Sequence, residues 1–265
     1  MNSKLEEIAL EMRKNIIMQL YSAGSGHPGG SLSAADIIAF LYFEEMNIPS
    51  FSDPNRDRFV LSKGHAAPAL YSALAEKGSI DKGELITLRK LGSRLQGHPS
   101  MGIDGIEVPT GSLGLGLSAA VGMALAAKLD GAPYRTYALC GDGEIQEGIV
   151  WEALMAASHY GLGSLTVIVD NNGLQIDGPV SDVMSPYPIA QKAIAFGFDA
   201  FECSGHSFDS LREAFAKAKA SPKPAMVIAE TVKGKGVGFM ENDVGWHGKA
   251  PNKEEYEQAM ACLEG

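Results

Sequence analysis

The 265-residue sequence has little of what marks several large classes of protein. Its three cysteines, Cys140, Cys203 and Cys262, lie far apart and form no CxxC pair, so we expect buried thiols in a reducing compartment rather than disulfides or zinc ligands. Lysine and arginine are scattered through a chain of formal net charge −10, which leaves no basic face for nucleic acid. No charged and then apolar leader opens the sequence, and no apolar run is long enough to cross a bilayer. These absences predict a cytoplasmic protein that binds neither nucleic acid nor membrane.

What is present is an ordinary globular composition, 45% hydrophobic and 20% charged, without repeats or low-complexity linkers. The length suits one large domain, which we expect to span residues 1–265. Segments with helical periodicity alternate with short apolar or β-branched runs, which predicts an α/β fold: a parallel sheet with helices on both faces. We expect helices at 5–21, 33–46, 66–76, 189–196, 209–220 and from 253, an Ala-rich helix ending at Leu129, and strands at 58–62, 136–140, 165–169, 200–203 and 225–231.

The central unit of this alternation is a β-α-β segment that contains Asp142 and Asn172. Each of these polar residues closely follows one of the two predicted strands. Ligands of open α/β sheets bind beyond the carboxyl ends of the strands, so Asp142 and Asn172 should converge on one site. The helix between the strands is expected to bury one face, formed by Ile149, Leu154, Met155, Ala157 and Ser158.

Carboxylate and amide oxygens suit a hard cation, Mg²⁺ or Ca²⁺, and Mg²⁺ commonly completes its shell with water and phosphate oxygens. The helix expected to start after Gly143 would point its free N–H groups at the same place, which favours a diphosphate. Gly143 has no Cβ, so a phosphate could approach its backbone closely. The segment therefore predicts a metal and a diphosphate bound together.

A dinucleotide-binding domain is an alternative, because Gly114, Gly116 and Ala119 match the pattern G-x-G-x-x-A. Two features count against it. The preceding segment contains Pro109 and a glycine, which break a strand. The first acidic residue downstream is Asp130, nearer than the ribose-binding acid of that fingerprint.

Four of the six histidines lie in loops beside glycine or proline, namely His27, His65, His98 and His247. We expect their imidazoles to be exposed at the same sheet edge as the metal pair. Their spacing does not fit a zinc site, whereas imidazoles suit proton transfer to hydroxyls and carbonyls and the orientation of a polyhydroxylated substrate. His159 on the central helix and His206 in a turn have ordinary structural explanations.

These residues together match a known family. Gly141-Asp142-Gly143, with Asn172 about thirty residues after Asp142, resembles the thiamine diphosphate motif of thiamine-dependent enzymes. Five further segments, in order, resemble the N-terminal half of transketolase, and the α subunit of 2-oxo acid dehydrogenases fits them less well. The segments are Ser25–Gly29, Phe59–His65, Gly97–Pro99, Thr110–Gly114 and Trp246–Gly248.

The resemblance implies roles for particular residues. Asp142, the side chain of Asn172 and the backbone carbonyl of Leu174 would bind Mg²⁺ or Ca²⁺. The residues implied to contact thiamine diphosphate are His65, Gly111, Ser112, Leu113, Gly143, Asn172 and His247. Those implied to hold the sugar are His27, His98 and His247, of which His27 and His247 would also transfer protons.

Two further pairs of charged residues fall outside these segments. Glu147 and Glu152 resemble carboxylates that link two cofactor sites across a subunit interface, although an ordinary pair complementing the helix dipole is the alternative. Lys233 and Lys235, beside glycines, are interpreted as surface turn residues without an assigned role.

The chain departs from the family in size. A transketolase also carries a pyrimidine-binding domain and a C-terminal domain, which hold the activating glutamate and the arginines for a sugar phosphate. We therefore expect a natural subunit that pairs with a separate C-terminal subunit, as α₂β₂, and transfers a two-carbon ketol unit from a ketose to an aldose. Another thiamine chemistry, such as decarboxylation of a 2-oxo acid, is the alternative. The sugar itself stays open between pentose phosphates, the default of the family, and branched or sulfonated sugars.

Overall fold

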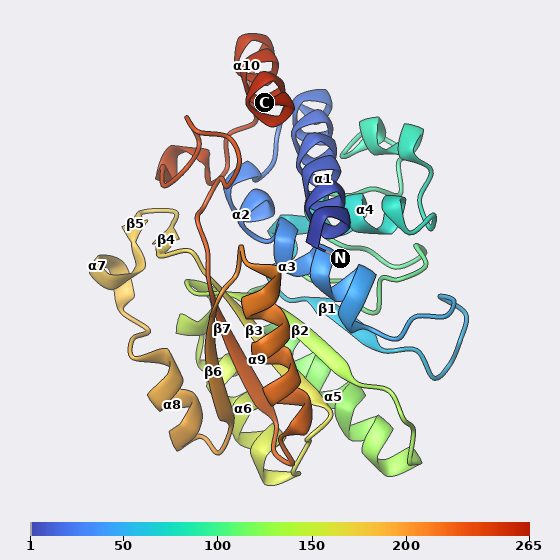
Figure 1. Ribbon diagram of the computed structural model, residues 1–265, viewed down its shortest axis with the longest axis vertical. Helices are drawn as coiled ribbons and strands as arrows, with labels where there is room; N and C mark the ends of the chain where they lie inside the picture. The colour runs from blue at the N-terminus through green and yellow to red at the C-terminus, as the bar shows by residue number, and fades with distance from the viewer. Residues whose placement is uncertain (1) are drawn as a thin grey trace.

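A five-stranded parallel sheet lies at the centre of the computed structural model, which describes residues 2–265 (Figure 1). The strand order is β1-β2-β3-β7-β6, so the chain passes from β3 to the edge strand β6 and then returns to fill the place between them. The expected α/β fold with a parallel sheet is confirmed. The strands are β1 (Arg58–Leu61), β2 (Thr136–Gly141), β3 (Leu165–Asn171), β6 (Asp199–Ser204) and β7 (Ala225–Glu230).

Helices cover both faces of the sheet, and each face has its own hydrophobic core. Alternate residues of β2 divide between the two: Tyr137 and Leu139 face one core, Ala138 and Cys140 the other. The first core includes residues of α1 (Asn2–Ala23), α3 (Ala35–Phe40), α4 (Ala67–Glu76), α9 (Phe208–Ala220) and α10 (Lys253–Glu264), the last of which packs against α1 away from the sheet (Figure 1). The second core includes residues of α5 (Leu115–Asp130), α6 (Gly148–His159) and α8 (Ile189–Ala195).

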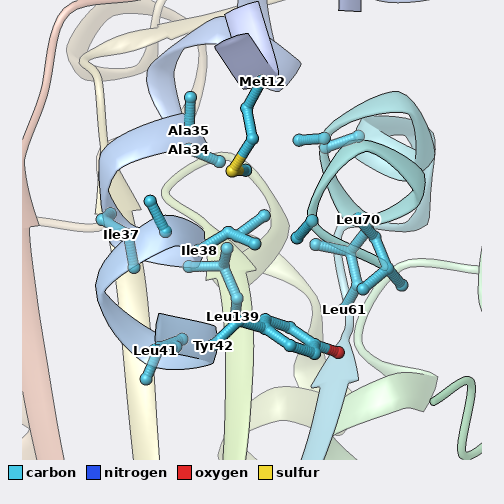
Figure 2. Close-up of a cluster of buried hydrophobic side chains, with 14 of the residues drawn as sticks. Met12, Ala34, Ala35, Ile37, Ile38, Leu41, Tyr42, Leu61, Leu70 and Leu139 are labelled. Carbon is cyan, nitrogen blue, oxygen red and sulfur yellow. The ribbon is translucent and has the colours of Figure 1, made fainter. Parts of the chain in front are cut away.

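Figure 2 shows how the first core joins these elements. Met12 from α1, Ile38 from α3 and Leu70 from α4 meet Leu61 and Leu139 from the strands, and all five are at most 2% exposed. Burying a side chain of this size stabilises the fold by roughly 1.5–3 kcal/mol. The core therefore fixes the N-terminal helices against the strands whose ends carry the polar residues.

Short elements complete the chain. These are α2 (Pro28–Ser33), the hairpin of β4 (Leu174–Gln175) and β5 (Gly178–Pro179), α7 (Val180–Met184), a π-helical turn (Leu41–Glu45), and 3₁₀ turns at Gly64–Ala66, Lys82–Thr87, Glu144–Gln146 and Val244–Trp246. Asp81 caps the second of these turns, with its side chain accepting a hydrogen bond from Gly83 N. None of the helices within residues 2–265 is both long enough and apolar enough to span a membrane.

The expected helix at 33–46 is wrong as a single element. The segment instead contains the end of α2, the whole of α3 and the π-helical turn that ends at Glu45. Proline at the first position of α2 starts that helix earlier, because its ring presets a helical φ. Every residue of α2 and α3 is buried, so the hydrophobic periodicity does not distinguish a solvent-exposed from a buried face and cannot mark where one helix ends and the next begins.

The central helix also differs from expectation. A 3₁₀ turn follows Gly143, and α6 begins only at Gly148. Its buried residues are Val150, Ala153, Leu154 and Ala157, whereas Met155, expected to point inward, is 58% exposed. Of the three cysteines, Cys140 and Cys203 are buried as expected, but Cys262 on α10 is exposed.

Candidate functional site

The carboxyl ends of the strands meet at one edge, where a cavity of about 360 Å³ opens. The structure brings ten of the residues singled out in the sequence to this cavity. They are His27, His65, Gly111, Leu113, Asp142, Gly143, Glu147, Asn172, Leu174 and His247. Segments far apart in the sequence thus form one site, as the strand order requires.

Asp142 follows β2 and is 2% exposed. Gly143 N donates to its Oδ1 at 2.8 Å, and Gly173 N donates to its Oδ2. Burial and the nearby Asp170 carboxylate raise the pKa of Asp142 to about 6 despite these bonds. A buried carboxylate whose ionised form is disfavoured in this way would gain from a cation beside it.

Lys233, interpreted from the sequence as a surface turn residue, is instead 1% exposed and lines the cavity, so that interpretation is wrong. Its Nζ donates to the Leu174 carbonyl at 3.0 Å and lies 2.9 Å from His247 Nδ1. Burial and the charge of Lys63 lower the pKa of Lys233 to about 8. The residue therefore places a cation beside the expected metal ligand Leu174.

A buried ion pair forms the floor of the site. Lys63 follows β1, is 1% exposed and pairs with the fully buried Asp170 on β3. Its Nζ also donates to the Gly30 carbonyl at 3.0 Å. Asp170 accepts further hydrogen bonds from Ser33 Oγ and Thr231 Oγ1. These contacts tie α2, β1, β3 and the end of β7 together below the cavity.

The four loop histidines gather as expected. The His27 ring lies 5.3 Å from that of His65, 5.5 Å from that of His247 and 6.4 Å from that of His98. His98 is exposed and does not line the cavity, whereas the other three are partly buried rather than exposed. Partial or full burial and neighbouring cations lower the pKa of all four, to about 4 for His27 and about 3 for His247. They are therefore neutral at physiological pH.

Glu144 is a buried carboxylate that fixes the loop before α5. Its Oε1 accepts from Ser62 Oγ and, at 2.9 Å, from Gly114 N, while its Oε2 accepts from Gly141 N at 3.0 Å. Burial raises the pKa of this carboxyl. The carboxylate thereby joins the Gly111–Gly114 loop to the ends of β1 and β2.

The other residues predicted from the sequence lie at or outside the edge of the cavity. Ser112 is exposed beside the cavity-lining Leu113. Glu147 and Glu152 are both exposed, and only Glu147 lines the cavity. Lys235 is partly exposed and pairs with Glu241.

Four buried charged residues of the site received no role from the sequence: Lys63, Glu144, Asp170 and Lys233. A signal exists for Asp170, which ends an apolar run, and for Lys63, which follows a strand beside the expected site residue His65. Lys233 and the partly exposed Lys235 both adjoin Gly234, and such a glycine-rich turn gives no signal that Lys233 is buried.

The dinucleotide-binding alternative fails in the structure. Gly114 is the N-cap of α5, but no described strand lies between β1, which ends at Leu61, and that helix. The β-turn-α context that the fingerprint requires is therefore missing from the described part of the chain.

Comparison with known proteins is consistent with this geometry. The family model described as transketolase, thiamine diphosphate binding domain, matches residues 6–263. A Phocaeicola vulgatus protein, named as one of the subunits of apulose-4-phosphate transketolase, is 44% identical over 251 residues, covering 94% of this chain and 89% of that protein. A Clostridium protein named 6-deoxy-6-sulfo-D-fructose transketolase subunit SqwG is 42% identical, covering 98% of this chain and 96% of that protein.

Longer relatives match over only part of their length. Human transketolase is 46% identical over 261 residues, which are 97% of this chain but 41% of the human protein. The solved transketolase of Campylobacter jejuni superposes with a TM-score of 0.89 at 34% identity, over 97% of this chain and 43% of that one. That of Leishmania mexicana gives a TM-score of 0.90 at 34% identity, over 98% of this chain and 41% of that one.

Proposed function

The chain belongs to the transketolase family, and we propose from this that it is the thiamine diphosphate-binding subunit of a split transketolase. The observation that carries the proposal is the share of each relative's length that this chain covers. The chain covers 89% and 96% of two relatives named as transketolase subunits, but 41% of the human enzyme. A second polypeptide would then supply the rest of the active site.

The residues at the strand ends fit the diphosphate and a divalent cation. Asp142, the Asn172 side chain and the Leu174 carbonyl would hold Mg²⁺ or Ca²⁺, an oxygen-only set that a hard cation prefers. Leu174 O already accepts from Lys233 Nζ, but a carbonyl has two lone pairs and can serve both. The raised pKa of Asp142 and the ammonium of Lys233 both favour a ligand that combines a cation with phosphate oxygens.

The loops around the cavity would bind the other end of the cofactor. We propose contacts from His65, Gly111, Ser112, Leu113 and His247, with Gly143 and Asn172 at the diphosphate. Gly111 has φ +146°, in the region that favours glycine, so another residue there would be strained. When bound, thiamine diphosphate would supply the carbon acid that breaks and forms the C–C bond.

Three of the loop histidines would bind the sugar substrate. His27, His98 and His247 would bind its hydroxyls and carbonyl, with His27 and His247 moving protons. The lowered pKa values of His27 and His247 keep both rings neutral, so that each ring has one nitrogen free to accept a hydrogen bond from a hydroxyl. The Nδ1 atom of His27 is buried without a hydrogen-bond partner among residues 2–265, which leaves it available to a ligand.

The substrate class is a ketose donor and an aldose acceptor, with a two-carbon unit transferred between them. The two relatives named as subunits carry different sugars in their names, so the identity of the sugar is left open. The partner would be a C-terminal transketolase subunit in an α₂β₂ assembly. Glu147 and Glu152, both exposed, would face the second cofactor site across that interface.

Calorimetry tests the cofactor site. The chain together with its C-terminal subunit should bind thiamine diphosphate with Mg²⁺, lose binding in EDTA, and show no heat with NAD. Asp142→Ala should abolish Mg²⁺-dependent binding without loss of helical circular dichroism. Asp177→Ala, an exposed carboxylate on the same cavity, is the matched control. Unchanged affinity in Asp142→Ala would refute the metal assignment.

A substrate screen tests the reaction. The reconstituted pair should transfer a ketol unit from ketose phosphates or sulfonated ketoses to aldoses. Turnover of 2-oxo acids alone would overturn ketol transfer while leaving the thiamine diphosphate site intact. A C-terminal transketolase half in the neighbouring reading frame would identify the partner to use.

A further inference from the structure

Lys233 reaches the cavity from the loop that follows β7. Two backbone hydrogen bonds fix this loop. Gly234 N donates to the Gly29 carbonyl of α2 at 3.0 Å, which places the loop beside that helix. Asn242 N donates to the Lys233 carbonyl at 2.9 Å and closes the loop on itself. Two further bonds come from residues that do not line the cavity.

Those two bonds hold the residues on either side of Lys233. Val232 N donates to His206 Nε2 at 2.8 Å. The Lys235 carbonyl accepts from Arg13 Nε at 3.0 Å. His206 follows β6 and Arg13 lies on α1, so two elements that are distant in the sequence both hydrogen-bond the loop.

Asp36 on α3 joins the two residues. Arg13 donates to both of its carboxylate oxygens, at 2.9 and 2.6 Å, and His206 Nδ1 lies 2.6 Å from Oδ2. The three side chains are at most 16% exposed. Burial opposes ionisation of Asp36, but the His206 hydrogen bond and the Arg13 charge lower its pKa to about 2. The carboxylate is thus a permanent acceptor for both partners.

The bonding fixes the state of His206. Because Nε2 accepts from Val232 N, it carries no proton, and the ring proton lies on Nδ1 and points to Asp36. A doubly protonated ring, or the tautomer with the proton on Nε2, would oppose the Val232 N–H. Only the Nδ1–H imidazole satisfies both neighbours.

We propose that His206, held by Asp36 and Arg13, is a positioning residue that sets Lys233 against Leu174 and His247. It does not line the cavity and acts through the backbone of Val232. Its effect on the cofactor rests on the proposed function, whereas its effect on Lys233 rests on the hydrogen bonds alone.

The tautomer can be read without any substitution. In the full chain labelled with ¹⁵N-histidine, long-range ¹H–¹⁵N spectra at pH 7.5 should report His206 as the Nδ1–H tautomer. A spectrum with the proton on Nε2, or on both nitrogens, would overturn the proposal, because neither form can accept from Val232.

Two substitutions then separate the bonds of the ring. The amide of His206→Asn lies near the position of Nδ1 and can keep the Asp36 bond, whereas that of His206→Gln reaches toward Nε2 and can accept from Val232. Loss of the acceptor should speed hydrogen exchange at Val232 N by about tenfold or more in the Asn variant. His159→Asn, the same change at an exposed histidine of α6, should leave that exchange unaltered.

Lys233 provides the second readout. In the wild type and in His206→Gln, nuclear Overhauser effects should connect its Hε protons with the His247 ring, because Lys233 Nζ lies 2.9 Å from His247 Nδ1. In His206→Asn these effects should weaken as the ammonium moves away from His247. Equal exchange and equal Overhauser effects in the two variants would overturn the positioning role.

Cofactor binding separates this inference from the proposed function. With the C-terminal subunit present, His206→Asn should bind thiamine diphosphate more weakly than His206→Gln. If the wild type does not bind it while the exchange and Overhauser results hold, the proposed function fails and the positioning role stands. If all variants bind equally and Lys233 is unmoved, the positioning role fails alone.

Discussion

Asp170 is the carboxylate at the floor of the site, and Asp170→Asn should destabilise the chain strongly. The side chain is fully buried and pairs with Lys63, which is itself 1% exposed. Asparagine has nearly the same shape but no charge. Lys63 would then keep its ammonium in the interior without a counter-charge, beside only the neutral Gly30 carbonyl and the new amide.

Removal of one partner from a buried ion pair leaves an uncompensated charge, which costs about 3–5 kcal/mol. Urea unfolding at pH 7, followed by circular dichroism, should show this loss for Asp170→Asn. Glu213→Gln, which breaks an exposed pair with Lys217, should leave the free energy of unfolding nearly unchanged. Addition of Lys63→Met to Asp170→Asn should restore part of the loss, because it removes the orphaned charge. A loss below about 1 kcal/mol for Asp170→Asn would refute the reasoning.

The pH dependence follows from the direction of the Asp170 shift. Burial opposes ionisation, but the Lys63 charge and the hydrogen bonds lower its pKa below the ordinary 3.8. A carboxyl with a lowered folded-state pKa stabilises the fold above its unfolded pKa, and the contribution is lost as pH falls through the folded value. The difference in stability between wild type and Asp170→Asn should therefore close only below pH 3.8.

Three further predictions concern the cavity and α5. Binding of thiamine diphosphate with Mg²⁺ should weaken as pH falls below about 6, where Asp142 becomes protonated, as calorimetry across pH would show; a flat profile would contradict this. Arg89→Gln should raise the pKa of His98 part of the way toward 6.5, since burial also lowers it, and NMR titration would detect no change if the Arg89 charge were irrelevant. Gly116→Ala should cost about 1–3 kcal/mol in urea unfolding, because its Cβ would lie 2.7 Å from a backbone atom at the end of β1. Gly122→Ala on the same helix meets nothing within 4 Å and should instead stabilise by about 0.5–1 kcal/mol; equal effects would refute this packing argument.

Sequence reasoning was most successful where residues act through backbone topology. Asp142 and Asn172 follow neighbouring parallel strands, and the carboxyl ends of such strands lie at the same edge of the sheet, independently of the tertiary contacts elsewhere. The loop histidines were found because glycine and proline beside them mark loops. The parallel sheet followed from the alternation of elements.

The exposure of individual side chains could not be predicted from the sequence, because it depends on tertiary contacts. Met155 has the spacing of a core residue but is exposed, since periodicity alone cannot assign an apolar residue to the core or to an outer face. Lys233 and Lys235 lie on either side of Gly234, yet only Lys233 is buried, because contacts with Leu174 and His247, which are distant in the sequence, hold it there. Such partners become visible only after folding.

The central claim is that this chain is one half of a two-chain transketolase site. The most direct measurement is ketol transfer at a fixed amount of this chain, with saturating thiamine diphosphate and Mg²⁺, during titration with the C-terminal subunit. We predict no transfer at the start and a rise that levels off when the two chains are equal in number. Full activity before any partner is added, or none after it, would contradict the account.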